Sequence, residues 1–157
     1  MVKLTVYGYR LGYHSEVEFL PFKRCLIASE NQGSTVEHLR PTMANLLEYL
    51  LANAVGNIVP DKMLQTQVWE NNGLSCSSQR LWQVMNNLKS KLAKAGLPDN
   101  FIQRIGGKGY KIPDNLVLQL YCKANAVNIA AGNKPLSHMQ QNKPSARKMV
   151  EQKTLMV

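Results

Sequence analysis

The sequence predicts an α+β domain in which an N-terminal antiparallel sheet is followed by three helices and a C-terminal β-hairpin. Short apolar runs separated by turn residues fill residues 5–38, a pattern typical of small antiparallel strands. Apolar residues then recur at helical spacing in three stretches between residues 41 and 95. A glycine-rich turn inside residues 101–112 is flanked by two short apolar runs, which indicates a hairpin.

The N-terminal strands include the runs at 17–20 and 25–28, which are bounded by Gly12, Pro21 and the polar stretch 29–34. Pro41 then opens the first helix, because proline suits the first helical position, and Gly56 marks its exit. The apolar stripe of this helix is Met43, Leu46, Leu47, Leu50 and Leu51.

A second helix is predicted from Pro60-Asp61 through Met63, Leu64, Val68 and Trp69, and we assign Trp69 to the core. The segment 70–78 interrupts the pattern and is predicted to be a loop. Ser77 or Ser78 can cap the third helix by accepting a hydrogen bond from a free backbone amide, and Gly96 followed by Pro98 ends it.

The third helix is amphipathic and basic. Its apolar stripe is Leu81, Val84, Met85, Leu88 and Leu92, and the opposite side carries Gln79, Gln83, Asn86, Asn87, Ser90 and Lys94. No Asp or Glu lies between Asn71 and Pro98, whereas a solvated helix face usually mixes both charges. The missing acids indicate a polyanionic partner.

The hairpin is predicted as a strand over 101–105, a turn over 106–109 and a returning strand over 110–112. Beyond Pro113, the run at 116–122 fits either a strand or a short helix. The polar, basic tail from Gly132 lacks periodicity and is predicted to be disordered. We therefore divide the chain into an N-terminal sheet (1–40), a core of the same domain (41–112) and a C-terminal extension (113–157). We assign no function to the segment 115–131. Three roles remain as alternatives: pairing with the sheet, a dimer contact, or a peptide that binds an adaptor protein.

The charge is concentrated in the second half of the chain. Of a net +9 over 157 residues, residues 1–70 hold 6 basic and 7 acidic side chains, and the remainder holds 13 basic and 3 acidic. Such a surface should bind an anion with strong salt dependence, but charge alone does not separate DNA, RNA and membrane. Three scattered cysteines, and no run of about 18 apolar residues, favour a cytoplasmic protein.

A basic helix followed by a basic hairpin is how a winged helix holds DNA. Gln79, Gln83, Asn86 and Asn87 are the candidate base-reading residues, because a carboxamide can donate and accept together against adenine. The candidate phosphate-binding residues are Arg80, Lys89, Lys91, Lys94, Arg104 and Lys108. The plainer alternative for both sets is a solvated surface. Trp82, at the border of the apolar stripe, is predicted to be a packing residue rather than a contact to a thymine methyl group or a sugar.

No enzyme constellation is present in the sequence. His14, His38 and His138 are too scattered for a metal site or a catalytic base, and Cys76 has no evident histidine partner. The glycines of the turn at 106–109 lack the spacing of a phosphate-cradling loop. We expect no catalytic residue, metal or cofactor.

The order of elements and three motifs resemble the winged helix-turn-helix effector domain of the OmpR/PhoB type over about residues 16–112. These motifs are WENNG before the third helix, LKSKL at 88–92 and GKGYKI at the end of the hairpin. The resemblance implies that the third helix enters the major groove of duplex DNA and the hairpin touches the adjacent minor groove. It also implies two copies on neighbouring half-sites, arranged as direct repeats, and an RNA polymerase contact at Asn71, Asn72 and Leu74.

Two departures from the resembled pattern affect these expectations. Gly106 stands where phosphorelay members usually have an arginine, so that phosphate contact is absent or passes to Arg104 or Lys108. The segment before the first helix is too short for a receiver domain, so we expect no direct control by phosphorylation. The organisation is more similar to ToxR/CadC-like regulators, without their membrane helix.

The leading hypothesis is a bacterial, cytoplasmic, sequence-specific transcription regulator that binds duplex DNA and forms a homodimer on it. The alternative is a winged-helix protein-interaction module that acts on another regulator, because a fold does not guarantee a function. Binding of single-stranded RNA is the weaker third hypothesis, since exposed aromatic residues for stacking are few.

Overall fold

A computed structural model describes residues 3–123 of the chain. The chain forms two compact units. Residues 8–118 make up the main unit, and the other combines residues 1–7 with residues 119–157, of which 3–7 and 119–123 are described. The predicted disordered tail lies outside the described residues, and the division of the chain at residues 40 and 112 stays a prediction.

The N-terminal sheet forms as predicted, and a late strand joins it. Its strands are β1 (Leu4–Leu11), β2 (Val17–Leu20), β3 (Cys25–Glu30), β4 (Gly33–His38) and β7 (Val117–Lys123), in the order β4-β3-β2-β1-β7. The ambiguous run at 116–122 is thus a strand, and it pairs with the sheet. The register places Leu11, Val17 and Ala28 in one row, and all three are buried.

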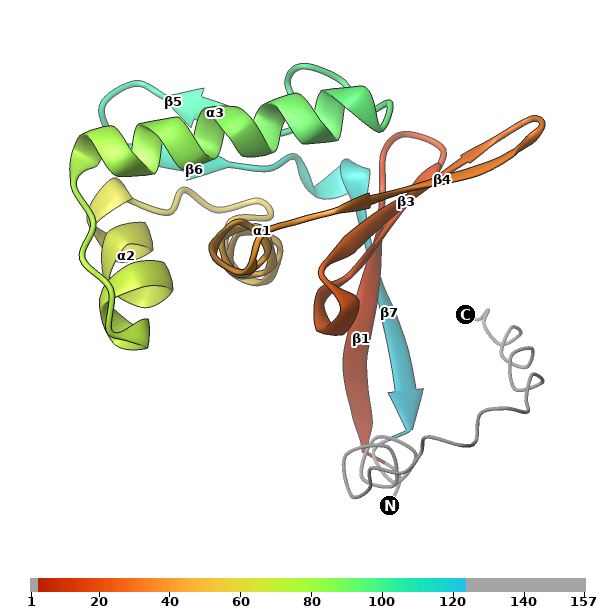
Figure 1. The fold of residues 1–157 in the computed structure, drawn as a ribbon, viewed down its shortest axis with the longest axis horizontal. Coiled ribbons are helices and arrows are strands. Elements are labelled where there is room, and N and C mark those ends of the chain that lie inside the picture. Colours follow the sequence, from red (N-terminus) through yellow and green to blue (C-terminus); the bar gives the residue numbers. More distant parts are fainter. Residues whose placement is uncertain (1–2, 124–157) are drawn as a thin grey trace. The chain divides into compact units, whose positions relative to one another are not determined.

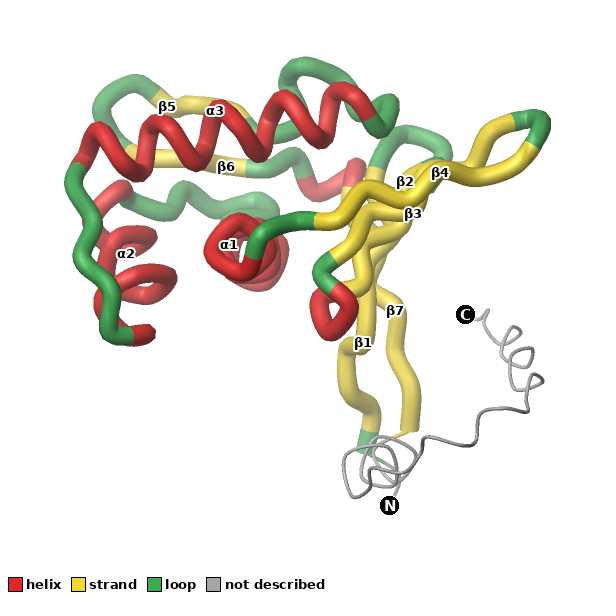
Figure 2. Tube along the Cα trace, viewed as in Figure 1, coloured by secondary structure: helices red, strands yellow, loops and turns green. Residues whose placement is uncertain are grey.

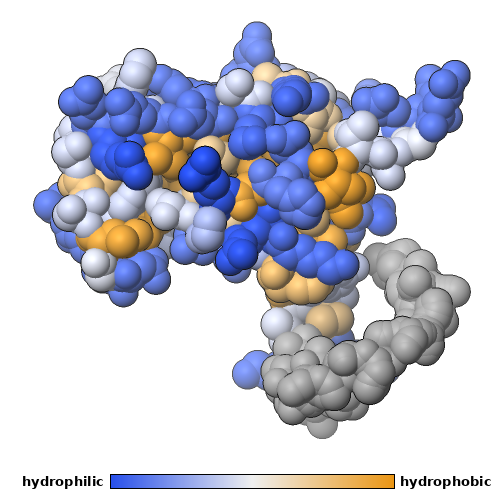
Figure 3. All heavy atoms as spheres, in the orientation of Figure 1, coloured by the Kyte–Doolittle hydropathy of each residue, from blue (hydrophilic) through white to orange (hydrophobic). Residues whose placement is uncertain are grey.

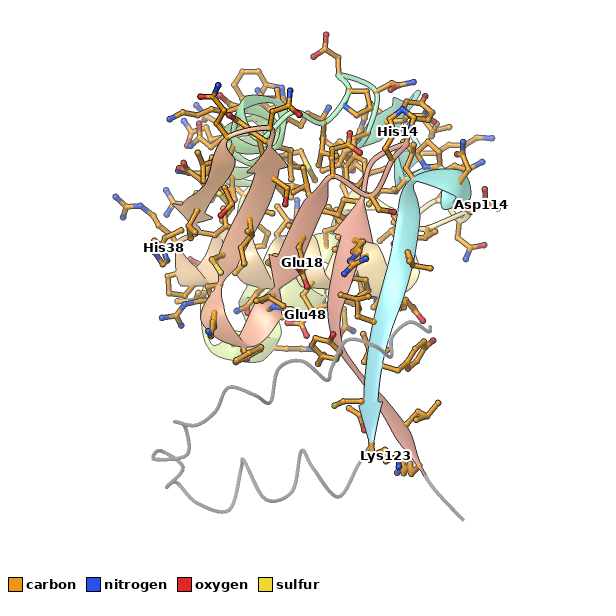
Figure 4. The ribbon with its side chains drawn as sticks, turned by 90° about the vertical axis from the view of Figure 1, so that its right-hand side faces the viewer. His14, Glu18, His38, Glu48, Asp114 and Lys123 are labelled. Carbon is orange, nitrogen blue, oxygen red and sulfur yellow. The ribbon has the colours of Figure 1, made fainter. Side chains whose placement is uncertain are left out.

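The main unit packs its helices against one face of this sheet. Figure 4 views the sheet from the side away from the helices, with Glu18 on the strand surface toward the viewer. Because side chains alternate along a strand, the residues on either side of Glu18, Val17 and Phe19, point inward, and both are fully buried. The core therefore lies between the sheet and the helices.

Helix α1 (Pro41–Asn53) is the central helix of the main unit (Figures 1 and 2). Pro41 occupies its first turn, as the sequence predicts. Six of its residues are buried: Met43, Ala44, Leu46, Leu47, Leu50 and Leu51. It packs against the turn that follows β2, the second helical segment and the third helix, so it connects the sheet to the other two helices.

The second helical segment is longer and less regular than predicted. Helix α2 (Asp61–Leu64) continues as a π-helical turn, Gln65–Trp69, and a 3₁₀ turn, Glu70–Asn72. Gly73 ends it at φ 76°, a left-handed conformation that glycine adopts without strain. The predicted loop start at Glu70 is therefore wrong by one turn. Trp69 is buried, as predicted.

Helix α3 (Ser78–Lys94) is followed by the hairpin of β5 (Gln103–Ile105) and β6 (Gly109–Lys111), which lies alongside it in Figure 1. The predicted first strand is too long. Phe101 and Ile102 precede β5 rather than belonging to it, because the Phe101 amide donates to the Pro98 carbonyl in a turn. Both side chains are buried in the core. We call residues 101–112 the wing.

Candidate nucleic-acid interface

Local sequence signals position helix α3. The Ser77 hydroxyl caps it by accepting a hydrogen bond from the Arg80 amide at 3.1 Å. Four residues at helical spacing, Leu81, Met85, Leu88 and Leu92, are at most 2% exposed. Val84, the fifth predicted member of the stripe, is half-buried. Because this side is anchored in the core, the opposite side of α3 must face solvent or a partner.

The candidate base-reading residues lie on that outer side. Gln79, Gln83 and Asn87 are exposed and Asn86 is half-buried. None of the four side chains forms a hydrogen bond with another residue in the described range 3–123. Their amide donors and acceptors are therefore open to an external partner. The surface over α3 is mostly hydrophilic, as Figure 3 shows.

Trp82 corrects a prediction. Its side chain is 61% exposed, so it is not the packing residue that the sequence suggested. Successive residues of a helix are rotated by about 100°, and Trp82 follows Leu81, a member of the buried stripe. It is thus turned onto the flank of the outer face, where Gln79 and Asn86 are its neighbours three and four residues away.

The six candidate phosphate-binding residues fall into two groups. Arg80, Lys94 and Lys108 are exposed, and none of them forms an ion pair within the described part of the chain. Lys89, Lys91 and Arg104 instead have partners inside the protein. Sequence reasoning missed this division, since each partner comes from another element.

Lys91 forms an ion pair with Glu37 of β4, which is 54 residues away in the sequence. The hydrogen bond from Lys91 lowers the pKa of the Glu37 carboxyl, and the charge of Lys91 adds to the effect. The carboxylate therefore stays ionised and keeps its partner at neutral pH. The pair fixes the Lys91 flank of α3 to the edge of the sheet.

Arg104 joins the wing to the start of α2. Its guanidinium bonds the Asp61 carboxylate at 2.5 Å, and its Nε donates to the Gly106 carbonyl at 3.0 Å. The hydrogen bond to Asp61 raises the pKa of Arg104. The guanidinium carbon also lies 4.7 Å from the centre of the Tyr110 ring, which is within the range of a cation–π contact.

The same ring receives a second cation from α3. The Lys89 Nζ lies 5.6 Å from the centre of the Tyr110 ring. Burial lowers the pKa of Lys89, and the charge of Arg104 lowers it further. Two cations and one carboxylate, Asp61, thus meet around Tyr110 where α3 joins the wing. This junction carries an excess of positive charge.

Backbone hydrogen bonds hold the wing against the connection between α1 and α2. Val59 and Tyr110 exchange two of them, at 2.9 and 3.0 Å, and the Ile112 amide bonds the Ala54 carbonyl at 2.9 Å. Strand β6 is therefore paired on both sides, by β5 and by this connection. The wing is a fixed part of the main unit, and Lys108 lies exposed at its turn.

The predicted polymerase-contact residues lie at the end of the second helical segment. The side-chain amides of Asn71 and Asn72 bond back to Gln67 and to the Val68 carbonyl, at 3.1 and 2.9 Å. Leu74 is 48% exposed, although its backbone amide bonds the Trp69 carbonyl. The two asparagines thus shape the turn, and Leu74 offers an apolar surface beyond it.

The described histidines and cysteines are dispersed. His14, in the loop after β1, and His38, at the end of β4, lie apart in Figure 4, and residues 3–123 contain no group of three side chains that could hold a metal ion. His138 lies outside the described residues. The three cysteines are unpaired, and burial raises the pKa of each thiol. Raised pKa values favour the protonated thiol, which is the less nucleophilic form.

Comparison with known proteins assigns the family. The model of the C-terminal domain of transcriptional regulatory proteins matches residues 34–112, from β4 to the end of the wing. The chain belongs to this family. Its members are DNA-binding transcription regulators of the OmpR/PhoB type, so the resemblance stated from the sequence motifs is confirmed. This family is a class of regulators and not of enzymes.

A solved structure supports the same fold. The DNA-binding domain of Escherichia coli CadC superposes with a TM-score of 0.57 at 19% sequence identity, and the match covers 74% of this chain and 99% of that one. The predicted winged helix-turn-helix architecture with an N-terminal sheet is thereby confirmed. No curated protein sequence matches the chain. Among the described residues, no helix is both long and apolar enough to cross a membrane.

Proposed function

We propose that this regulator binds duplex DNA sequence-specifically, with α3 in the major groove and the wing at the adjacent minor groove. The observation that carries the proposal is the outer face of α3, which presents unbonded carboxamides and cations and has no acid along its length. The similarity of the fold to a DNA-binding domain supports it. A helix of this kind fits the major groove, where base edges can be distinguished.

Each group of residues takes one part of this interface. Gln79, Gln83, Asn86 and Asn87 read base edges, and the unpaired cations Arg80, Lys94 and Lys108 bind phosphates. Lys89, Lys91 and Arg104 join them as phosphate ligands at the cost of their internal contacts. Two copies occupy neighbouring half-sites and dimerise on DNA, because one module buries too little surface for tight selective binding.

The regulator acts in the bacterial cytoplasm, and the loop after α2 contacts RNA polymerase. Leu74 supports the polymerase contact, because it is 48% exposed next to a turn that internal hydrogen bonds hold in shape. The side chains of Asn71 and Asn72 contribute mainly by forming that turn.

The alternative function is a protein-interaction module that uses the same surface. The internal pairing of Lys91 and Arg104 favours it, because charge neutralised inside the protein attracts DNA less strongly. Anisotropy of labelled genomic duplex fragments, measured at several salt concentrations and followed by selection and sequencing, separates the two. An enriched motif with steep salt dependence supports the regulator. Absence of duplex binding supports the interaction module.

Replacing Gln83 by alanine is expected to cost about 1 to 3 kcal/mol of binding free energy on the selected site and to relax specificity at one base position. The loss on random duplex should be much smaller, since the carboxamide reads a base and not a phosphate. Asn45→Ala is the matched control, because Asn45 is an exposed carboxamide on α1. Equal losses on selected and random duplex for Gln83→Ala would remove its base-reading role.

Replacing Glu37 by glutamine is expected to raise the affinity for any duplex. The change frees Lys91 from its carboxylate partner, so that its phosphate contact no longer requires the ion pair to break. The gain should be modest, about twofold to fivefold, because a solvent-exposed ion pair stabilises little. Glu48→Gln removes the same charge from an exposed position on α1 that forms no ion pair within residues 3–123, and it should raise the affinity less. Equal affinities of the two variants for duplex would contradict the exchange of partners.

A further inference from the structure

Trp82 is the one large apolar side chain that α3 exposes. It is 61% exposed, although the four leucine and methionine residues of the same helix, Leu81, Met85, Leu88 and Leu92, are buried on the core side. Covering an indole ring removes a large apolar area from water, so leaving it uncovered is unfavourable. Trp82 is the fifth residue of this 17-residue helix, so it lies near the N-terminal end, where recognition helices contact base edges.

The surroundings of Trp82 indicate what covers it. No cation–π contact, ring contact or hydrogen bond involves its side chain within residues 3–123. Lys89, two turns further along the helix, lies over Tyr110. Its neighbours on the helix surface are the carboxamides of Gln79 and Asn86. An isolated apolar group within a polar, cationic face does not resemble the contiguous apolar centre of a protein interface.

We propose that Trp82 is a specificity-determining residue that packs against the C5 methyl group of a thymine in the major groove. This inference rests on the proposed function. The thymine methyl is the apolar group among the base edges of the major groove, whereas the other edges offer hydrogen-bond donors and acceptors. The indole would thus read thymine beside positions where the carboxamides read adenine.

The test removes that methyl group from DNA and the indole from the protein. Each thymine of the selected site is replaced in turn by deoxyuridine, which lacks only the methyl group. At one position, wild-type protein should lose affinity by about fourfold, the value for one buried methyl-sized group. Trp82→Ala should bind the thymine site more weakly and lose nothing further on deoxyuridine at that position.

Two controls make the result specific. Tyr13→Ala removes an aromatic side chain of similar exposure, 59%, from a loop of the sheet, and it should retain the full deoxyuridine effect. Circular dichroism should show unchanged folding of Trp82→Ala, since the ring is exposed. Acrylamide quenching reports on the ring directly. Trp82 is accessible and Trp69 is 2% exposed, so bound duplex should protect the Trp82 emission from the quencher.

The outcomes separate this inference from the proposed function. If the wild-type protein selects a motif but acrylamide still reaches Trp82 in the complex, the inference is overturned and the regulator stands. Protection without any deoxyuridine effect would place the ring on the sugar–phosphate backbone and overturn thymine reading. If the wild-type protein binds no duplex, the proposed function fails and thymine reading fails with it.

Discussion

Replacing Gly109 by alanine is expected to lower the free energy of unfolding by about 3 kcal/mol or more, through strain and overpacking together. A Cβ atom at this position would lie 2.1 Å from the Val59 carbonyl oxygen and 2.7 Å from its carbon. The backbone at Gly109 also has φ +155°, which side chains rarely adopt. The carbonyl cannot turn away freely, because it accepts the Tyr110 amide at 3.0 Å. Urea unfolding followed by circular dichroism measures the loss.

Gly107→Ala is the matched control for this prediction. Gly107 lies two residues earlier, in the turn that precedes β6, and a Cβ atom there meets no atom within 4 Å. Its replacement should change stability by less than about 0.5 kcal/mol, as is usual at open surface positions. Equal losses for the two variants would mean that the wing does not approach Val59 as described.

The close contact between Gly109 and Val59 should affect DNA binding as well as stability. The clash pushes β6 away from the connection between α1 and α2, and Tyr110 moves with it. Lys89 and Arg104 both contact the Tyr110 ring, so the charge at the junction of α3 and the wing would be displaced. Gly109→Ala protein that remains folded at low temperature should therefore bind duplex more weakly than Gly107→Ala.

Local signals in the sequence predicted helices α1 and α3. Pro41, the Ser77 cap and Gly96 delimit α1 and α3, because capping and backbone freedom depend on residues close in the sequence. The buried stripe of α3 followed from its periodicity. The run at 116–122 stayed ambiguous, since a short apolar run fits a strand or a helix until its pairing partner is known.

The ion pairs between residues far apart in the chain could not be predicted from the sequence. Glu37 and Lys91 are 54 residues apart, and Asp61 and Arg104 are 43 apart, so no spacing rule connects them. Six candidate phosphate-binding residues looked alike in the sequence, and the structure divides them by their internal partners. The prediction that Trp82 packs in the core was wrong for a different reason. An apolar residue beside an apolar stripe is usually a packing residue, and only the structure shows that this one is turned outward.

The ion pairs divide the cations of the proposed interface into two kinds. Arg80, Lys94 and Lys108 form no ion pair within the described part of the chain, whereas Lys91 and Arg104 would have to exchange a carboxylate for a phosphate. Exposed ion pairs stabilise a fold little, so the exchange is not costly. Glu37 and Asp61 meanwhile hold the Lys91 and Arg104 side chains in ordered positions at two edges of this proposed interface.

Replacing Leu88 by alanine is expected to lower the free energy of unfolding by about 2 to 5 kcal/mol, because it opens a cavity under α3. Leu88 is fully buried in the middle of the stripe that anchors the helix, between Met85 and Leu92. The urea midpoint should fall with an unchanged slope, since the surface exposed on unfolding hardly changes. Alanine is a good helix former, so the loss would come from packing and not from helix propensity.

Ser90→Ala is the control for Leu88→Ala, because Ser90 lies two residues later on the exposed side of the same helix. It should leave stability unchanged or raise it slightly through helix propensity. Under conditions where both variants are folded, the affinity of Leu88→Ala for the selected duplex should stay within about twofold of wild type, since no base-reading side chain is removed. A large loss of affinity in folded Leu88→Ala protein would show that packing beneath α3 sets the positions of Asn86 and Asn87. Equal stability of the two variants would contradict the burial of this helix face.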